Sequence, residues 1–320
     1  MEIFEIKGNL TVPKTNKSGQ LRKVMAGLFS AVAAAMFPIA GMTQSCVDPD
    51  ALTFAMVPTE ETVAELELYK PVIDKLEAAT GKSVQFFMPT SYASVVEGMV
   101  GKFVNVAVLG PSSYVTANRL DPKIEVFATY AKRPGTFQAE GPGYQAVLVS
   151  RSDSSFDSIA SLEGALVGLT DPGSTSGELL PRVVFTKEIG GVPLEEYFSK
   201  TVYTGSHELS AVAVAEGKVD AAFIATHRLD NVVNKGDVKA EDFQIIWSSS
   251  FVPQDPFVYR TDLCQDLRDQ ISSAFLSLSM DDPESKEFLD NVKANKFVSM
   301  TSEDYDLIRD LQAAKKAAKN

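Results

Sequence analysis

The sequence predicts an α/β protein of two lobes, each with a mostly parallel sheet flanked by helices. Three observations predict this fold. Short apolar runs alternate with segments of helical periodicity, the alternation begins again near residue 145, and after about residue 250 the chain returns to helices. Alternation of this kind indicates βαβ units, and 320 residues can form two medium domains without disulfides or metals to complete a core.

The first series of elements runs from residue 52 to residue 130. Buried strands are predicted at 52–57, 84–87, 104–109 and 124–130. Amphipathic helices are predicted at 63–80, 92–100 and 112–119. Gly81 follows the first of these helices as a C′ residue should, and Pro71 is expected to set the start of that helix or a kink in it.

The second series begins at a strand over residues 145–150. Further strands are predicted at 166–170, 200–203, 219–224 and 243–247, and helices after Ser174 and at 210–216, 264–278, 284–291 and 305–317. The last three helices are expected to return to the first lobe. The predicted lobes are therefore residues 46–145 with 251–320, and residues 146–250, joined by crossings near 143–150 and 247–253 that form a hinge.

Residues 1–45 have the pattern of an export leader. They hold five basic and two acidic residues, and an apolar run covers residues 24–42. A cleavable signal with the mature chain beginning near Cys46 is the favoured interpretation, and a membrane anchor is the alternative. The leader is long, so translation starting near Met25 is also considered. Of the net charge of −12, the rest of the chain carries −15, which disfavours binding to nucleic acid.

The two cysteines, Cys46 and Cys264, leave alternatives open. Cys46 directly after the apolar run could be lipidated and tether the protein to a membrane, although Thr43-Gln44-Ser45 makes a poor lipobox. A Cys46–Cys264 disulfide is equally compatible with an oxidising compartment, and the cysteines could also remain free. With two histidines and no CxxC pair, the sequence predicts no metal site and no cofactor.

The most informative segment is Asp171-Pro172-Gly173-Ser174-Thr175-Ser176-Gly177-Glu178-Leu179. It lies between a predicted buried strand and an apolar helical run, so three consecutive hydroxyl groups stand at a helix N-terminus. Unpaired N–H groups and the helix dipole favour an anion there. Ordinary capping by Ser174 is the alternative, but a cap needs one such residue. The segment has neither the P-loop pattern nor the nucleophile elbow.

A second segment, Gly205-Ser206-His207-Glu208, follows a predicted strand in the same series. The carboxyl ends of neighbouring strands meet at one edge of an open α/β sheet, where such sheets bind ligands. A single histidine is more often structural. Its position beside the Ser174 segment nevertheless favours a role for His207 in binding.

In their order, these motifs resemble the phosphite- and phosphonate-binding proteins of bacterial ABC transporters, which have the type II periplasmic binding protein fold, a Venus flytrap. The resemblance covers about Leu52 to Leu278. It rests on the two segments above and on Ser91-Tyr92-Ala93, Glu97-Gly98-Met99, Pro142-Gly143-Tyr144, Val219-Asp220, Pro253-Gln254-Asp255-Pro256 and Arg260.

The resemblance implies roles for eight residues. The phosphoryl oxygens would be held by Ser174, Thr175, Ser176 and His207. Tyr92 would reach across from the other lobe. In aminoethylphosphonate binders of this family a Tyr, a Glu and an Asp surround the ligand's ammonium; Tyr144 and Asp255 match, whereas the Glu position is His227. Losing that carboxylate leaves a buried ammonium poorly paired, so aminophosphonates should bind poorly.

The sequence therefore predicts a monomeric, periplasmic solute-binding protein that delivers a small oxyanion to an ABC transporter permease. Phosphite is the first choice, methylphosphonate the second and phosphate the third. Asp255 would accept a proton from a monoanionic ligand and repel a dianion. The alternatives are a binder of phosphate or of larger phosphonates and, less favoured, an enzyme on the same fold, because no nucleophile–base–orienter set is evident beyond the hydroxyls near His207.

Overall fold

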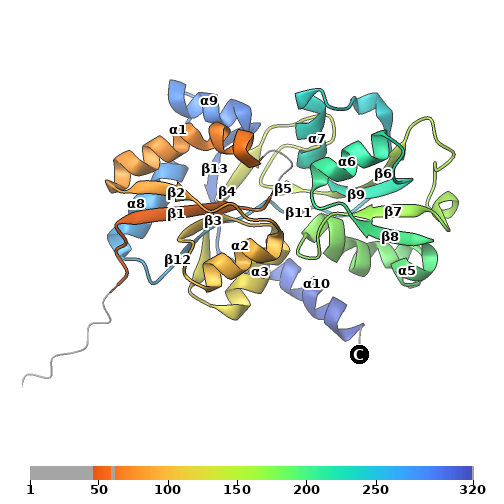
Figure 1. Ribbon diagram of the computed structural model, residues 1–320, viewed down its shortest axis with the longest axis horizontal. Helices are drawn as coiled ribbons and strands as arrows, with labels where there is room; N and C mark the ends of the chain where they lie inside the picture. Colours follow the sequence, from red (N-terminus) through yellow and green to blue (C-terminus); the bar gives the residue numbers. More distant parts are fainter. Residues whose placement is uncertain (1–45, 59–61, 319–320) are drawn as a thin grey trace, which may run out of the picture. The chain divides into compact units, whose positions relative to one another are not determined.

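Two mixed sheets organise the computed structural model, which describes residues 46–58 and 62–318 (Figure 1). The predicted export leader, residues 1–45, lies outside the described residues. We call the six-stranded sheet with its helices the first lobe, and the five-stranded sheet with its helices the second lobe. The structure thus has the two-lobed α/β architecture that the sequence predicts.

The first lobe has the strand order β13-β4-β12-β3-β1-β2. Its strands are β1 (Ala51–Met56), β2 (Ser83–Phe86), β3 (Val106–Val108), β4 (Ile124–Lys132), β12 (Phe257–Arg260) and β13 (Ala294–Ser299). Along β1 the side chains alternate between two cores: Phe54 packs into one apolar cluster and Ala55 into the other, as the two-residue period of a strand requires.

Helices cover both faces of this sheet. One face carries α1 (Thr62–Thr80), α8 (Gln265–Leu276) and α9 (Pro283–Asn291), and the other carries α2 (Tyr92–Val100), α3 (Pro111–Leu120) and α10 (Asp306–Ala317) (Figure 1). Pro71 lies inside α1, and Gly81 just after it adopts a φ of +67°, the left-handed geometry expected of a C′ glycine.

The second lobe has the strand order β10-β6-β9-β7-β8. Its strands are β6 (Ala146–Arg151), β7 (Leu166–Leu169), β8 (Lys200–Tyr203), β9 (Ala221–Ala225) and β10 (Phe243–Ser248). One face packs on α6 (His207–Ala215), which in turn contacts α7 (Thr226–Lys235). The other face packs on η2 (Thr175–Leu179), which leads into η3 (Pro181–Phe185), α4 (Thr186–Glu188) and then α5 (Leu194–Tyr197).

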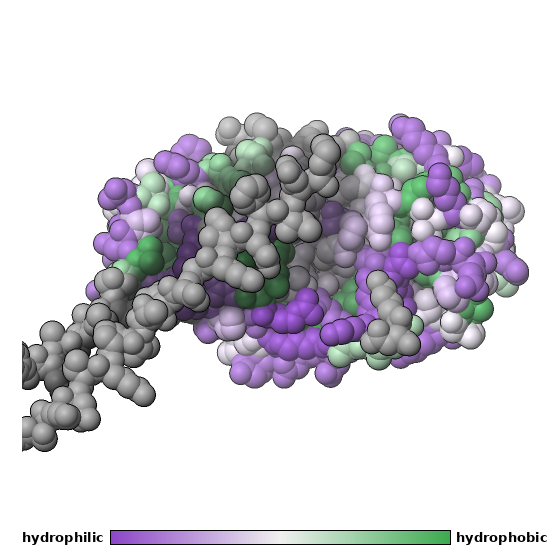
Figure 2. Space-filling model, turned by 60° about the horizontal axis from the view of Figure 1, so that its bottom comes forward, coloured by the Kyte–Doolittle hydropathy of each residue, from purple (hydrophilic) through white to green (hydrophobic). Residues whose placement is uncertain are grey.

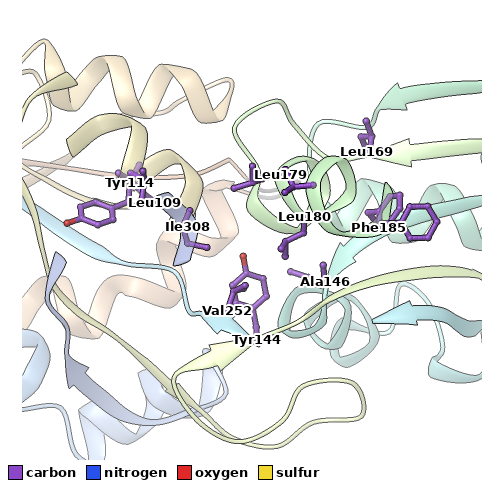
Figure 3. Packing of buried hydrophobic residues seen from close by; sticks show 14 of the residues in the cluster. Leu109, Tyr114, Tyr144, Ala146, Leu169, Leu179, Leu180, Phe185, Val252 and Ile308 are labelled. Carbon is purple, nitrogen blue, oxygen red and sulfur yellow. The ribbon is translucent and has the colours of Figure 1, made fainter. Parts of the chain in front are cut away.

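A two-stranded ribbon connects the lobes. Strand β5 (Gly143–Tyr144) pairs antiparallel with β11 (Val252–Pro253), close to the two crossings that the sequence predicts. The apolar cluster around the ribbon is continuous from lobe to lobe. Figure 3 shows Tyr114 and Ile308 of the first lobe and Leu180 and Phe185 of the second, with Tyr144 between them.

The structure corrects the expectation of mostly parallel sheets. In each sheet only the strands joined by helical crossovers are parallel, β2, β1 and β3 in the first lobe and β8, β7 and β9 in the second. The other pairings are antiparallel. The antiparallel strands include those next to the ribbon, β6, β10 and β12, where the chain enters or leaves a sheet.

Strands β12 and β13 and helix α7 were not predicted from the sequence, and neither were the short ribbon strands β5 and β11 or the short helix α5. Helix α6 was predicted to begin at Ser210 but begins at His207, because Ser206 caps it by accepting the N–H of Leu209 at 3.0 Å. That earlier start places His207 in the first turn of a helix.

Cys46 forms a disulfide with Cys264, just before α8. A lipid thioether would need the same sulfur, so the structure corrects the lipidation alternative for Cys46. Among the described residues, no helix combines the length and apolar character needed to cross a bilayer. The face in Figure 2 shows hydrophilic side chains with small hydrophobic patches between them.

Candidate functional site

A small cavity lies where both lobes meet the ribbon. Seven of the eight residues predicted for the site line it. Its lining consists of Val57, Tyr92, Gly110, Tyr144, Ser174, Thr175, His207, Ala225, His227, Arg228 and Asp255. The eighth, Ser176, does not line the cavity, but its Oγ lies 3.3 Å from Nε2 of His207.

The first turns of several helices converge on this cavity. Tyr92 opens α2, Thr175 opens η2, and His207 opens α6, while Gly110 caps α3 and His227 is the second residue of α7. Each helix start presents N–H groups without partners within the helix and the positive end of the helix dipole. The cavity is therefore suited to an anion before any charged side chain is counted.

The segment Ser174-Thr175-Ser176, which we call the hydroxyl loop, both caps a helix and faces the cavity. Ser174 Oγ accepts the N–H of Gly177 at 3.0 Å, so Ser174 does cap the helix, as the alternative interpretation of this segment expected. Thr175 Oγ1 accepts the N–H of Ser112 from α3 of the first lobe at 2.8 Å. A Cβ at Gly177 would lie 2.1 Å from Thr170 Oγ1, so only glycine allows the helix to start this close to β7.

The loop also presses against the first lobe at Gly173. Its carbonyl accepts the hydroxyl of Ser113 at 3.1 Å. A Cβ there would lie 2.9 Å from Cβ of Tyr92 and 3.0 Å from Oγ of Ser113. Glycine is therefore what allows the two lobes to approach this closely beside the cavity.

His207 is a neutral hydrogen-bond donor to the hydroxyl loop. Its Nδ1 accepts the backbone N–H of Ala225 at 3.3 Å, which leaves the ring proton on Nε2. Nε2 lies 3.4 Å from Oγ of Ser174, so the ring N–H points to the hydroxyls. Burial, with a smaller contribution from the Arg228 charge, lowers the pKa of His207 to about 3.

Two tyrosines complete the walls as donors. Burial raises the pKa of Tyr92 and that of Tyr144 above the usual range, so both hydroxyls keep their protons. The Tyr144 ring meets the ring of His227 edge-on, with centroids 4.9 Å apart. The first lobe and the ribbon thus contribute hydroxyl groups on rigid aromatic side chains.

His227 is buried without a hydrogen bond. Neither ring nitrogen has a partner among the described residues, and 5 % of the side chain is exposed. Nε2 lies 3.5 Å from Oδ2 of Asp255, which is long for a hydrogen bond. Burial lowers the pKa of His227 to about 4, so the imidazole is neutral at physiological pH and available to a ligand.

Asp255 is an ionised carboxylate at the cavity. Its main chain is fixed by the hydroxyl of Thr129, which donates to the Asp255 carbonyl at 2.7 Å. Burial raises the pKa of Asp255, but the nearby His227 ring and the Arg228 charge outweigh it and lower the pKa to about 2. The side chain can therefore only accept hydrogen bonds at neutral pH.

Arg228 is a charged residue at the cavity that sequence reasoning missed. Its Nη2 lies 3.3 Å from Oδ2 of Asp255, and its Nη1 lies 3.7 Å from Oε1 of Glu208. Arg228 was missed because helix α7 was not predicted. This helix follows β9 directly and ends at Gly236, which has a φ of +86°. A helix starting at Thr226 places both His227 and Arg228 in its first turn.

Comparisons with known proteins agree with this geometry. Residues 54–305 match the family described as "ABC transporter, phosphonate, periplasmic substrate-binding protein". The chain is 32% identical to the "Phosphonates-binding periplasmic protein" of Escherichia coli over 248 residues, 76% of this chain and 70% of the relative. It is 30% identical to the "Phosphate-import protein PhnD" of Mycolicibacterium smegmatis over 233 residues, 71% of each chain.

Solved structures with the same fold include a binding protein component of an ABC phosphonate transporter from Pseudomonas aeruginosa. Its TM-score is 0.77 at 26% identity, covering 85% of this chain and 88% of that one. PhnD1 of Prochlorococcus marinus, solved in complex with methylphosphonate, has a TM-score of 0.71 at 19% identity, covering 83% and 98%.

Proposed function

The chain belongs to the family of periplasmic substrate-binding proteins of ABC phosphonate transporters, and from this premise we propose that its cavity captures a small phosphorus oxyanion. Phosphite is the first choice, methylphosphonate the second and phosphate the third. The protein acts as a monomer that closes its lobes on the ligand and delivers it to a permease.

The observation that carries the proposal is the wall formed by Ser174, Thr175 and neutral His207. These side chains, together with the N–H groups at the helix N-termini that carry them, can donate hydrogen bonds to the oxygens of a tetrahedral oxyanion. The cavity is small and closely surrounded by side chains from both lobes and the ribbon, which favours a ligand with little beyond its phosphorus oxyanion. The curated relatives are named for phosphate import and for phosphonate binding, which fits this ligand class.

The opposite end of a ligand would meet Asp255 and His227. An ammonium group there would find a neutral imidazole and a carboxylate that already has Arg228 at 3.3 Å. Burying a cation without its own counter-charge is costly, so aminophosphonates should bind weakly. A monoanion with a P–OH group instead donates a hydrogen bond to the Asp255 carboxylate and keeps its proton, whereas a dianion has no proton with which to make that bond.

The alternative of an enzyme is less well supported. Ser174 and Ser176 lie near Nε2 of His207, as a nucleophile lies near a base. However, Nδ1 of His207 accepts a backbone N–H, so Nε2 carries the proton and cannot take one from a serine. Recovery of unchanged ligand after denaturation distinguishes binding from catalysis.

Calorimetric titration of the mature protein tests the ligand assignment. Phosphite or methylphosphonate should bind about tenfold or more tightly than aminoethylphosphonate, a gap of about 1.4 kcal/mol. His227→Glu should shift preference toward aminoethylphosphonate by restoring a carboxylate. Phosphite affinity should fall as pH rises through its second ionisation. Tightest wild-type binding to aminoethylphosphonate would contradict the proposal.

Export is a further part of the proposal. The basic and apolar pattern of residues 1–45 predicts that the mature chain begins near Cys46. Mass spectrometry of the native protein should show an N-terminus in this region and a non-lipidated, disulfide-bonded Cys46. Retention of residues 24–42 in the mature protein would count against the export interpretation.

A further inference from the structure

Arg228 lies at the junction between two carboxyl groups from different parts of the chain. Asp255 follows β11 of the ribbon, and Glu208 stands in the first turn of α6 in the second lobe. The Arg228 guanidinium lies 3.3 Å from the first carboxylate and 3.7 Å from the second, with 12 % of its side chain exposed. The same side chain lines the cavity beside His227.

Resting on the proposed function, we infer that Arg228 is a specificity-determining residue that excludes ligands carrying a cation. It serves as the resident counter-ion of Asp255, so the carboxylate does not need a positive charge from the ligand. The site therefore accepts an uncharged or hydrogen-donating group beside Asp255 and rejects an ammonium group. The discrimination comes from the protein's own ion pair rather than from cavity size.

The electrostatic surroundings of Asp255 support this assignment. His227 Nε2 lies 3.5 Å from its carboxylate, and the imidazole is neutral at physiological pH because burial lowers its pKa to about 4. The charge of Lys132 acts on Asp255 more weakly than that of Arg228, and its Nζ donates to the carbonyl of Val292. Without Arg228, a buried carboxylate would lose its nearby cation, and such a charge is strongly destabilised until another cation replaces it.

Removing Arg228 should therefore turn the same pocket into one that favours an ammonium. The sharpest probe is a pair of ligands of equal size, 2-aminoethylphosphonate and propylphosphonate, because the ratio of their affinities reports only the exchange of ammonium for methyl. Wild type should prefer propylphosphonate. Arg228→Met should shift the ratio toward 2-aminoethylphosphonate by about tenfold or more, measured by calorimetric titration at constant pH and salt.

A double-mutant cycle identifies the partner. If Arg228 acts through Asp255, the shift should be absent in Arg228→Met combined with Asp255→Asn, because the carboxylate that seeks a cation is gone. Arg228→Lys should keep the wild-type ratio. Arg182→Met is the matched control: Arg182 pairs with Glu178 at 2.5 Å and Glu195 at 2.7 Å away from the cavity, so its loss should leave the ratio unchanged.

The outcomes separate this inference from the proposed function. A folded Arg228→Met protein with the wild-type ratio would overturn the inference while phosphite still binds. If wild type binds neither phosphite nor either phosphonate, the proposed function itself fails. If Arg228→Met does not fold, the Asp255→Asn variant tests the inference instead. It removes the carboxylate beside Arg228 and should raise the preference for propylphosphonate about threefold or more. An unchanged affinity ratio in Asp255→Asn would also overturn the inference.

Discussion

On the second-lobe side of the cavity, hydroxyl and imidazole groups from η2 and α6 point donors at one place, and all of these residues come from one contiguous stretch of chain. On the other side, Tyr92 comes from α2, Tyr144 from β5 of the ribbon, and Asp255 from the segment just after β11. Under the proposed function, the first side would hold any tetrahedral oxyanion. The second side would contact the remaining substituent, so this division would separate affinity from selectivity.

The largest effect should follow from removing donors on the second-lobe side. Under the proposed function, His207→Ala, or replacement of Ser174, Thr175 or Ser176 by Ala, removes a hydrogen bond to a charged ligand. Each should cost about 1.5–3 kcal/mol of binding free energy for every phosphorus oxyanion tested, with preference among ligands unchanged. Titration calorimetry measures both quantities.

Ser199→Ala is a matched control for these variants. Its hydroxyl donates to the carbonyl of Ala165 in the second lobe, away from the cavity, so binding should not change. Ser174→Ala should additionally lower the free energy of unfolding by about 1 kcal/mol, because Ser174 also caps η2. Unchanged affinity in all four site variants would mean that this wall does not hold the ligand.

Acid should destabilise the protein through its two buried histidines. In the folded state the pKa is about 3 for His207 and about 4 for His227. Both values lie below the pKa of about 6.5 that histidine has in the unfolded chain. Between these values the unfolded chain binds more protons, so stability falls as pH falls from about 6.5. Each histidine should cost about 2 kcal/mol at pH 5.

Denaturant unfolding across pH 5 to 8 measures this dependence. Replacing His227 by Gln should remove the contribution of one histidine to the loss of stability at acidic pH, while Ser174, Thr175 and His207 stay in place. Asp255 adds a further loss only below about pH 4, because its folded pKa of about 2 lies below the ordinary value of 3.8. A stability that is flat from pH 7 to pH 5 would show that the histidines are not held neutral.

The smallest effect is expected from Tyr92→Phe on the first-lobe side. The ring keeps its packing and only the hydroxyl is lost, so affinity should fall by about 1 kcal/mol. Small-angle scattering should still show compaction of wild type and variant when ligand is added, because the Ser174 wall remains intact. A particle that stays unchanged with ligand in both proteins would contradict closure of the lobes.

The sequence analysis located most of the cavity because the relevant residues lie where apolar runs end. Ser174 and His207 each follow a clear strand, and their helix starts place them at one edge of a sheet. The family resemblance added Tyr92, Tyr144, His227 and Asp255. What these residues do for a ligand remains a prediction.

Arg228 could not be found in the same way. Its helix, α7, carries many polar residues, and the importance of Arg228 depends on Asp255, which comes close only after the chain has crossed the ribbon. Strands β12 and β13 were missed because both are short, and β13 mixes apolar side chains with Asn295 and Lys296. β12 is a strand through its pairing with β3 and β4, and β13 through its pairing with β4, and such long-range pairing has no local signal.

The place of β12 in the first sheet has a consequence for the order of assembly. Residues 257–260 lie between β3 and β4, so the two halves of the sheet formed from residues 51–132 cannot join until the chain has passed through the whole second lobe. The second sheet, by contrast, is complete within residues 146–248. Cys264 follows β12 closely in the sequence, and its disulfide links it to Cys46, 218 residues earlier. The lobe that is synthesised first is therefore the one that is completed last.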